Sequence, residues 1–105
     1  MANVATVTDA DFQAFTAQKG VVLLDFGAEW CPPCKRMDPI IGQLSTELPQ
    51  VRVGKVDCDR SPGTAAANGV MGMPTFMVYK DGRKVDQIVG AVPKPALLAA
   101  LKRHL

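Results

Sequence analysis

The chain has 105 residues, of which 48% are hydrophobic and 21% are charged. These proportions are typical of a folded globular protein and exclude a disordered chain. The net charge is only +2, from 12 basic and 10 acidic side chains, so we expect no binding to nucleic acid or to an anionic membrane. The length suits a single domain, residues 1–105, and leaves no room for a second core.

The amino-terminal sequence MANVATVTDADF lacks the basic region and the long apolar region of a signal peptide. No window approaches the roughly 20 apolar residues that a membrane-spanning helix needs. We therefore expect a cytoplasmic protein that does not enter a membrane. Its three cysteines are too few to staple a secreted scaffold, so a close pair is expected to be reactive or metal-binding.

Two strands and a helix are predicted in the first quarter of the chain. Val4–Val7 predicts a short strand, and the apolar run Val21–Phe26 predicts a second. The second run has no polar alternation, which is typical of a strand covered on both faces in a parallel sheet. Between them we expect a helix that begins at an N-cap, Thr8, with Asp11 completing a variant of the capping box, and that stops at Gly20.

The middle of the chain predicts a long helix, a strand and a short helix. Pro39 lies inside the long helix and is expected to bend it. Val51–Val56 is the third predicted strand, and Ser61-Pro62 begins a short helix that ends at Gly69. The long helix is inferred from apolar residues at helical spacing, namely Met37, Ile40, Ile41, Leu44 and Leu48.

The last third predicts a hairpin and a closing helix. Thr75–Tyr79 and Val85–Val89 flank Asp81-Gly82, a strong signal for a hairpin turn. The closing helix has an apolar face and a basic end that complements the helix dipole; these residues are Leu97, Leu98, Leu101 and Leu105, then Lys102, Arg103 and His104. The order β-α-β-α-β-α-β-β-α predicts an α/β fold with a mixed five-stranded sheet flanked by four helices.

The segment EWCPPCKR, residues 29–36, places two cysteines three positions apart between a strand and a helix. Because Pro33 disfavours a helical conformation of Pro32, the helix is expected to start near Pro33. A thiolate of Cys31 or Cys34 at that end faces unpaired backbone N–H groups, which lower its pKa. We expect Cys31, as the more exposed sulfur, to attack a partner disulfide and Cys34 to resolve the mixed disulfide.

The two prolines stiffen the cysteine loop and remove two backbone donors. The donors left for the Cys31 thiolate are the N–H of Cys34, its thiol, and the N–H of Lys35. We therefore expect a preorganised loop with some loss of thiolate stabilisation.

Asp25 is a carboxylate within an otherwise apolar buried run, so burial should raise its pKa. Such a group within reach of a cysteine is a candidate proton acceptor. Lys55, on the neighbouring predicted strand, could moderate the shift. Met73-Pro74, directly before a strand, suggests a constrained X-Pro turn, for which a cis and a trans bond both stay open. If this turn approaches the cysteines, the backbone of Met73 could pair with an extended substrate.

Simpler interpretations stand beside these. The cysteine pair could be half of a zinc site, but only Cys58 and His104 remain as further ligands of that kind, and we favour redox chemistry. Cys58 is most simply a small apolar residue that ends a strand. Asp25 could be a buried polar residue satisfied by backbone or water.

The segments DFGAEWCPPCKRMDPI, GVMGMPTF, VGKVD, PGTA and IVGA resemble the thioredoxin family, over essentially the whole chain. The resemblance implies that Cys31 is the nucleophile, Cys34 the resolving thiol and Asp25 the buried acid/base, with Lys55 as its neighbour. It implies a cis-proline and a substrate groove formed by Trp30, Pro32, Pro33, Met73, Pro74, Gly90 and Ala91. It also implies protein disulfides as substrates, thioredoxin reductase as partner, and no cofactor or metal beyond the redox disulfide; we expect a monomer.

The chain departs from the family at three positions. Pro32 stands where the family usually has glycine, Gly27 where it commonly has a second tryptophan, and Met73 where it usually has a β-branched residue. Pro32 raises the alternative of an oxidant or isomerase on the same fold. A non-catalytic module that binds partners through the groove around Trp30, Met73 and Ala91 is a further alternative.

Overall fold

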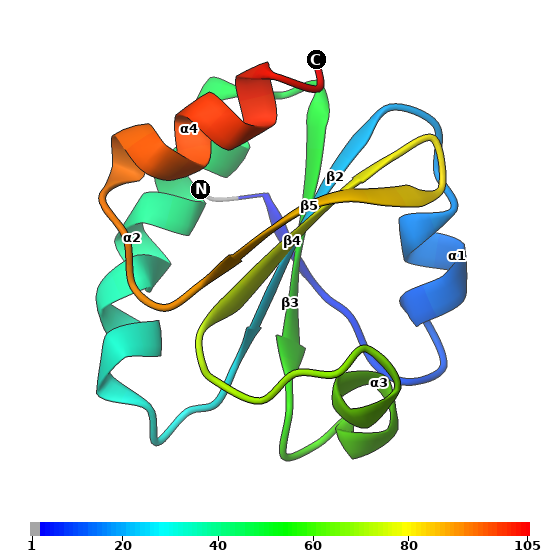
Figure 1. Ribbon diagram of the computed structural model, residues 1–105, viewed down its shortest axis with the longest axis vertical. Coiled ribbons are helices and arrows are strands. Elements are labelled where there is room, and N and C mark those ends of the chain that lie inside the picture. The colour runs from blue at the N-terminus through cyan, green and yellow to red at the C-terminus, as the bar shows by residue number, and fades with distance from the viewer. Residues whose placement is uncertain (1–2) are drawn as a thin grey trace.

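The structure, a computed structural model, describes residues 3–105 (Figure 1). Its elements follow the predicted order of strands and helices. They are β1 (Val4–Thr6), α1 (Phe12–Thr16), β2 (Val21–Gly27), α2 (Pro32–Glu47), β3 (Val51–Asp57), α3 (Pro62–Ala67), β4 (Thr75–Lys80), β5 (Arg83–Val89) and α4 (Lys94–Lys102). No helix within these residues is both long and apolar enough to cross a membrane.

The five strands form one mixed sheet in the order β1-β3-β2-β4-β5. β1 and β2 pair with β3 in parallel, whereas β4 is antiparallel to both β2 and β5. β2 therefore lies at the centre, and all seven of its residues are buried. This burial explains the unbroken apolar run that predicted the strand.

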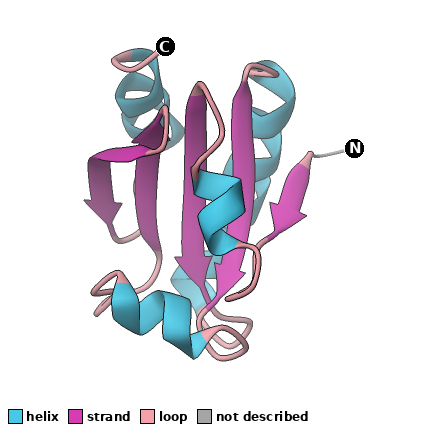
Figure 2. Cartoon of the chain, turned by 90° about the vertical axis from the view of Figure 1, so that its right-hand side faces the viewer, coloured by secondary structure: helices cyan, strands magenta, loops and turns pink. Residues whose placement is uncertain are grey.

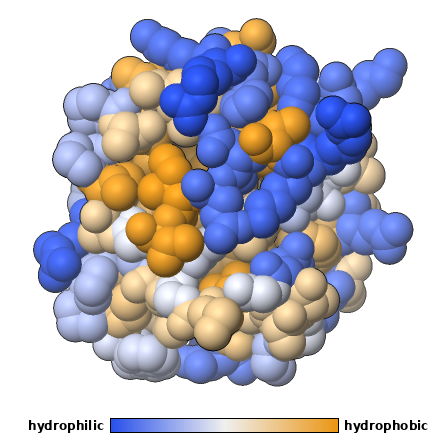
Figure 3. Space-filling model, viewed as in Figure 1, coloured by the Kyte–Doolittle hydropathy of each residue, from blue (hydrophilic) through white to orange (hydrophobic). Residues whose placement is uncertain are grey.

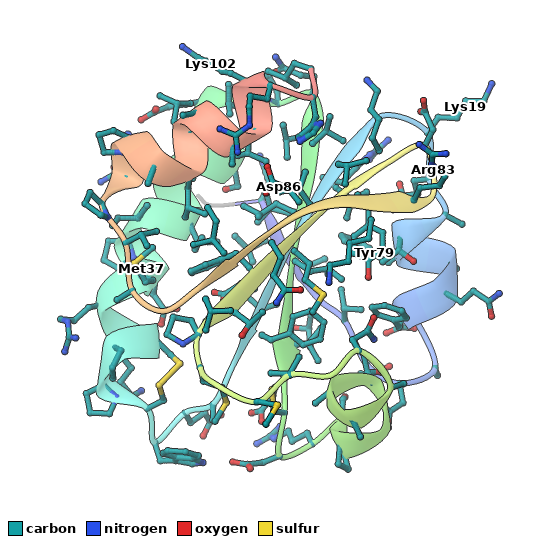
Figure 4. All side chains as sticks on the ribbon, viewed as in Figure 1. Lys19, Met37, Tyr79, Arg83, Asp86 and Lys102 are labelled. Carbon is teal, nitrogen blue, oxygen red and sulfur yellow. A yellow bond between two sulfur atoms is a disulfide. The ribbon has the colours of Figure 1, made fainter. Side chains whose placement is uncertain are left out.

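Helices cover both faces of the sheet, as Figure 2 shows from the side. The side chains of β2 alternate between two core layers. Figure 4 shows Met37 on α2 and Tyr79 on the opposite side of the sheet, toward α1. The layer under α2 and α4 includes Leu23, Met37, Ile41, Leu44, Phe76, Leu97 and Leu101; the layer under α1 includes Val7, Val22, Leu24, Phe26, Met77 and Tyr79.

The hairpin between β4 and β5 forms at the predicted turn. Asp81 and Gly82 have φ angles of 50° and 86°, which are the left-handed values that a type I′ turn requires. The backbone N–H of Gly20, also at positive φ, donates a 2.8 Å hydrogen bond to the side chain of Asp81. This bond ties the end of the α1 segment to the hairpin.

One predicted helix start is wrong in detail. The Asp11 carboxylate accepts the backbone N–H of Thr8 at 3.3 Å, as the predicted capping box requires, but the two residues enclose a separate turn and α1 is regular only over Phe12–Thr16. The Thr8 hydroxyl donates to the Asp11 carboxylate at 2.8 Å, and the Thr8 carbonyl accepts the N–H of Asp11. α2 begins at Pro32, directly after the N-cap Cys31, in agreement with the predicted start near Pro33. Pro39 lies inside α2 as predicted.

The carboxyl-terminal end of the chain also differs from expectation. Leu105 lies beyond α4 and is 49% exposed, so it does not belong to the apolar face of that helix. His104 is more than a dipole-complementing surface residue, because its Nε2 lies 3.3 Å from the carboxylate of Asp86 on β5. Arg103 pairs with the same carboxylate at 2.6 Å. α4 is thereby fixed to the edge of the sheet.

Candidate active site

The two cysteines of the CPPC sequence form a disulfide at the amino-terminal end of α2, the yellow bond beside the lower end of that helix in Figure 4. Their Cα atoms are 5.3 Å apart, an ordinary spacing for a disulfide. Cys31 is the N-cap, with φ −95° and ψ 105°, and Cys34 lies in the first turn. Pro32 and Pro33 occupy positions whose N–H groups would have no intrahelical partner, so the helix tolerates both.

The backbone N–H of Cys34 donates to Sγ of Cys31 at 3.3 Å, as one of the predicted donors. The N–H of Lys35 donates instead to the carbonyl oxygen of Cys31 at 3.1 Å, so it does not serve the sulfur. The prediction that Cys31 is the more exposed cysteine is wrong for this disulfide state. Cys31 is 4% exposed and Cys34 is 6% exposed, since Ala28 and Met73 pack against the pair.

The Met73-Pro74 segment lies beside the disulfide, and its peptide bond is cis. Sγ of Cys31 lies 3.9 Å from the carbonyl oxygen of Met73. The N–H of Gly90 donates a 2.7 Å hydrogen bond to the carbonyl of Pro74, which brings the end of β5 to the same place. Ala91 follows as an exposed residue. The structure therefore brings three separate segments of the predicted groove together at Cys31.

Trp30 is 64% exposed next to the disulfide, although a lone tryptophan is more often buried. Its indole Nε1 donates a 2.6 Å hydrogen bond to Oδ2 of Asp59, in the segment that follows β3. This partner was not predicted from the sequence. The face that carries β5 and α4 shows a gathering of apolar atoms in Figure 3, and Val89 on β5 is 58% exposed.

Asp25 is 1% exposed, and its Oδ1 has no hydrogen-bond partner among the described residues. Burial raises the pKa of Asp25 from 3.8 to about 7; the positive charge of Lys55 opposes this shift and the negative charge of Asp38 adds to it. A Cβ atom on Gly27 would lie 3.1 Å from Sγ of Cys34 and 3.9 Å from Oδ1 of Asp25. Gly27 has no side chain, so only its backbone lies beside the space between the Asp25 carboxyl and Sγ of Cys34.

A cavity of about 270 Å³ opens beside Gly27. Asp25 and Cys34 contribute to its lining, together with charged residues of α2, β3 and the adjoining loops. The buried carboxyl and the inner sulfur thus border the same cavity. Gly27 has no side chain to fill this space.

Lys55 pairs in register with Asp25 on the adjacent strand, as the predicted strand order required. Its Nζ, however, forms an ion pair of 2.7 Å with Oδ1 of Asp38 on α2. Asp38 was not predicted as a site residue. Its sequence signal was its position four residues after Cys34, which places both on one side of a helix.

Cys58 lies directly after β3 and is half-buried against the core layer under α1. Burial raises the pKa of its thiol, and the charges of Asp57 and Asp59 raise it further. His104 lies with Asp86 near α4, not with the cysteines. Within residues 3–105 no group of three or more potential ligands gathers as a metal site would require.

Comparisons of sequence and of structure with known proteins both point to one family. The model of the thioredoxin family matches residues 3–103. This chain belongs to the thioredoxin family. Among its relatives are thioredoxin 1 of Synechococcus elongatus, 41% identical over all of both chains, and a thioredoxin of Staphylococcus aureus, 43% identical over 97% of this chain and 98% of the relative.

Solved thioredoxin structures have the same fold. A single-site mutant of a thioredoxin from Halobacterium salinarum superposes with a TM-score of 0.90 at 32% identity, over 97% of this chain and 90% of the other. The thioredoxin of Fasciola hepatica gives a TM-score of 0.90 at 35% identity, over 96% and 99% of the two chains. With its cysteine pair at disulfide distance, this thioredoxin-family protein is a thiol–disulfide oxidoreductase that reduces substrate disulfides.

Proposed function

We propose that this protein reduces protein disulfides with Cys31 as nucleophile and Cys34 as resolving thiol. The Cys31 thiolate attacks one sulfur of a substrate disulfide, forms a mixed disulfide and releases the other substrate thiolate. The Cys34 thiolate then attacks Sγ of Cys31, forms the Cys31–Cys34 disulfide and releases the second substrate thiolate. The observation that carries the proposal is the pairing of these sulfurs at the mouth of α2.

The end of α2 supports Cys31 as the ionised sulfur. Its Sγ accepts the N–H of Cys34, and the positive end of the helix dipole favours a thiolate at the N-cap. The two prolines of the cysteine loop favour a reductase over an oxidant. A strong oxidant needs an unusually stable reduced form, whereas Pro32 and Pro33 offer no backbone donor to this sulfur.

Asp25 is proposed as the proton acceptor for Cys34, with Lys55 as its charged neighbour. A carboxyl with a pKa of about 7 changes protonation at the pH where the thiol must ionise, which suits it to general acid–base work. Oδ1 is free of other hydrogen bonds among the described residues, and both groups line the same cavity. The proton can therefore leave Cys34 and reach solvent along one route.

The substrate is proposed to bind as an extended segment across an apolar groove beside Cys31. An extended chain can pair with the backbone of Met73, as in strand addition, while side chains contact the exposed ring of Trp30. The proposed groove residues are Trp30, Pro32, Pro33, Met73, Pro74, Gly90 and Ala91.

Thioredoxin reductase is proposed as the partner that restores the dithiol, because the sequence carries no nucleotide-binding motif such as G-x-G-x-x-G. The half-buried free thiol of Cys58 and a reductant role both suit a reducing compartment, so we place the protein in the cytoplasm. We propose that residues 1–105 act as one monomeric domain without a metal or other cofactor. The small net charge supports no role for nucleic acid or a membrane surface.

Reduction of insulin by dithiothreitol tests the proposed roles. The protein should accelerate precipitation of the insulin B chain, and Cys31→Ser should return the rate to that of dithiothreitol alone. Cys34→Ser should instead trap a covalent complex with the substrate through Cys31, visible on a non-reducing gel. A trapped complex with Cys31→Ser but not with Cys34→Ser would reverse the two roles. Equilibration with a glutathione redox series separates a reductase from an oxidant.

A further inference from the structure

Two carboxylates lie near Lys55, and its ammonium pairs with one of them. Asp25 is its register partner on β2, and Asp38 lies on α2 across the cavity mouth. The ammonium pairs with Asp38 at 2.7 Å, with the two side chains 44% and 45% exposed. The structure holds no ion pair or hydrogen bond from any residue in 3–105 to Oδ1 of Asp25. Lys55 is thus held at the solvent side of the cavity.

A lysine that moved inward would change Asp25 strongly. An ion pair inside a buried site favours the ionised carboxylate and lowers its pKa. An Asp25 carboxylate locked in such a pair is a weaker base for the proton of Cys34. The position of the ammonium therefore matters for the proton transfer, and Asp38 is the group that fixes it.

We propose that Asp38 is a positioning residue, which holds the ammonium of Lys55 at the cavity mouth and so keeps the Asp25 carboxyl free to exchange a proton with Cys34. The inference rests on the proposed role of Asp25 in the reduction. Asp38 is not one of the proposed groove residues, and its carboxylate pairs with Lys55. It acts through Lys55, and in addition its own negative charge disfavours ionisation of Asp25.

Other charged and titratable groups surround Asp25, and a test must separate them from Asp38. Phe76, the β4 residue opposite Asp25, is apolar. The thiol of Cys58, after β3, also lies within electrostatic range of Asp25. The remaining groups line the cavity from α2, from β3, from the loop before α2 and from the loop after β3. They are Cys34, Lys35 and Asp38, then Lys55 and Asp57, then Glu29, and then Arg60.

Glu29 provides the matched control. It is an acidic residue of the same cavity rim, 78% exposed, and its carboxylate lies 3.8 Å from Arg60 rather than near Lys55. Asp38→Asn and Glu29→Gln each remove one negative charge from the rim with little change of shape. Only the first releases Lys55.

The test is the titration of the Asp25 carboxyl in the oxidised protein, followed by carbon NMR of a 13C-labelled aspartate sample. Asp38→Asn should move the Asp25 midpoint to lower pH by about half a unit to one unit, while Glu29→Gln moves it by clearly less. When Lys55 is already replaced by Met, Asp38→Asn should shift the Asp25 midpoint by less than half as much. In that background only the direct repulsion between the Asp38 and Asp25 carboxylates is lost. Equal shifts in the two rim variants, or an undiminished shift without Lys55, would overturn the proposal.

The second readout is the pH dependence of the resolving step, measured as release of substrate from a preformed mixed disulfide. Its midpoint should follow the Asp25 titration in Asp38→Asn and stay in place in Glu29→Gln. If the NMR midpoint moves but the resolving step does not, Asp25 is not the proton acceptor and the proposed role of Asp25 fails instead. Thermal unfolding at pH 5, where Asp25 keeps its proton in the folded parent and in both folded variants, should be nearly unchanged, since exposed ion pairs contribute little to stability.

Discussion

Trp30 and Asp59 are joined by a 2.6 Å hydrogen bond between indole Nε1 and Oδ2, across 29 residues of sequence. The bond holds a largely exposed aromatic ring at a fixed angle beside the disulfide. Ordering the ring in advance reduces the entropy that a substrate loses on binding. The loop after β3 therefore supports a residue of the proposed groove, although no residue of this loop was predicted to do so.

Asp59→Ala should weaken the binding of protein substrates without changing the chemistry. We expect the KM for insulin to rise by about two- to fivefold, the size of one exposed hydrogen bond, with reduction of a small disulfide unchanged. Trp30 is the one tryptophan of the chain, so its fluorescence anisotropy reports the release of the ring directly. Asp59→Asn keeps an acceptor oxygen and should behave as the parent; an equal loss in both variants would contradict this account.

Asp25 should make the folded state less stable as pH rises. Its pKa is about 7 in the folded protein and about 3.9 in an unfolded chain. Between these values the unfolded chain has lost its proton and the folded protein has not, so the free energy of unfolding falls from pH 4 to pH 7 and then levels off.

Asp25→Asn removes this titrating group, and the asparagine side chain has nearly the same shape as that of aspartate. Relative to the parent, the variant should gain on the order of 4 kcal/mol in free energy of unfolding between pH 4 and pH 8. Urea unfolding of both oxidised proteins at the two pH values measures the difference, in which the other titrating groups cancel. Parallel pH dependences in parent and variant would show that Asp25 is ionised normally in the fold.

Cys58 should be a slow thiol that the reaction does not use. Burial and nearby carboxylates raise its pKa, so its thiolate fraction at pH 7 is small. In the reduced protein, iodoacetamide should label Cys31 at least about tenfold faster than Cys58, as peptide mass spectrometry can follow. Cys58→Ala should keep full insulin reduction; a loss of activity with an unchanged fold would assign this thiol a role.

Gly54 on β3 is required by close packing between the sheet and the α1 segment. A Cβ atom there would lie 2.6 Å from Cγ2 of Val7 and 2.8 Å from Cε2 of Phe15. Gly54→Ala should therefore lower the free energy of unfolding by about 1–3 kcal/mol in urea denaturation. Gly72→Ala is the control, because its Cβ would approach no atom closer than 3.4 Å, and it should change stability by about 0.5 kcal/mol at most.

The sequence was sufficient for the element order and for the chemical centre. The pattern of apolar residues, the turn residues and the cysteine spacing are all local signals in the sequence. They predicted the positions of β2, α2 and the Asp81-Gly82 turn correctly. Asp25 stood out because a carboxylate in a buried strand is costly. α1 was predicted too long, since the hydrogen bonds between Thr8 and Asp11 close a turn that the same residues could equally have used as a cap.

The partners of the site were harder to predict, since they depend on contacts between distant segments. The bond from Trp30 to Asp59 and the ion pair from Lys55 to Asp38 need the relative position of loop, strand and helix. The prediction that Cys31 is the more exposed cysteine was wrong for a similar reason. Met73 packs against that sulfur from a loop 42 residues away, and no local pattern around the cysteines indicates it.

The burial of Asp25 in the central strand has a consequence for attempts to improve this protein. A selection that rewards only heat tolerance should discard this carboxyl early, because replacing it removes a source of instability at neutral pH. If Asp25 has the proposed role, the survivors would be stable proteins with an impaired exchange reaction. Screens for robust variants therefore need turnover, and not survival alone, as the criterion.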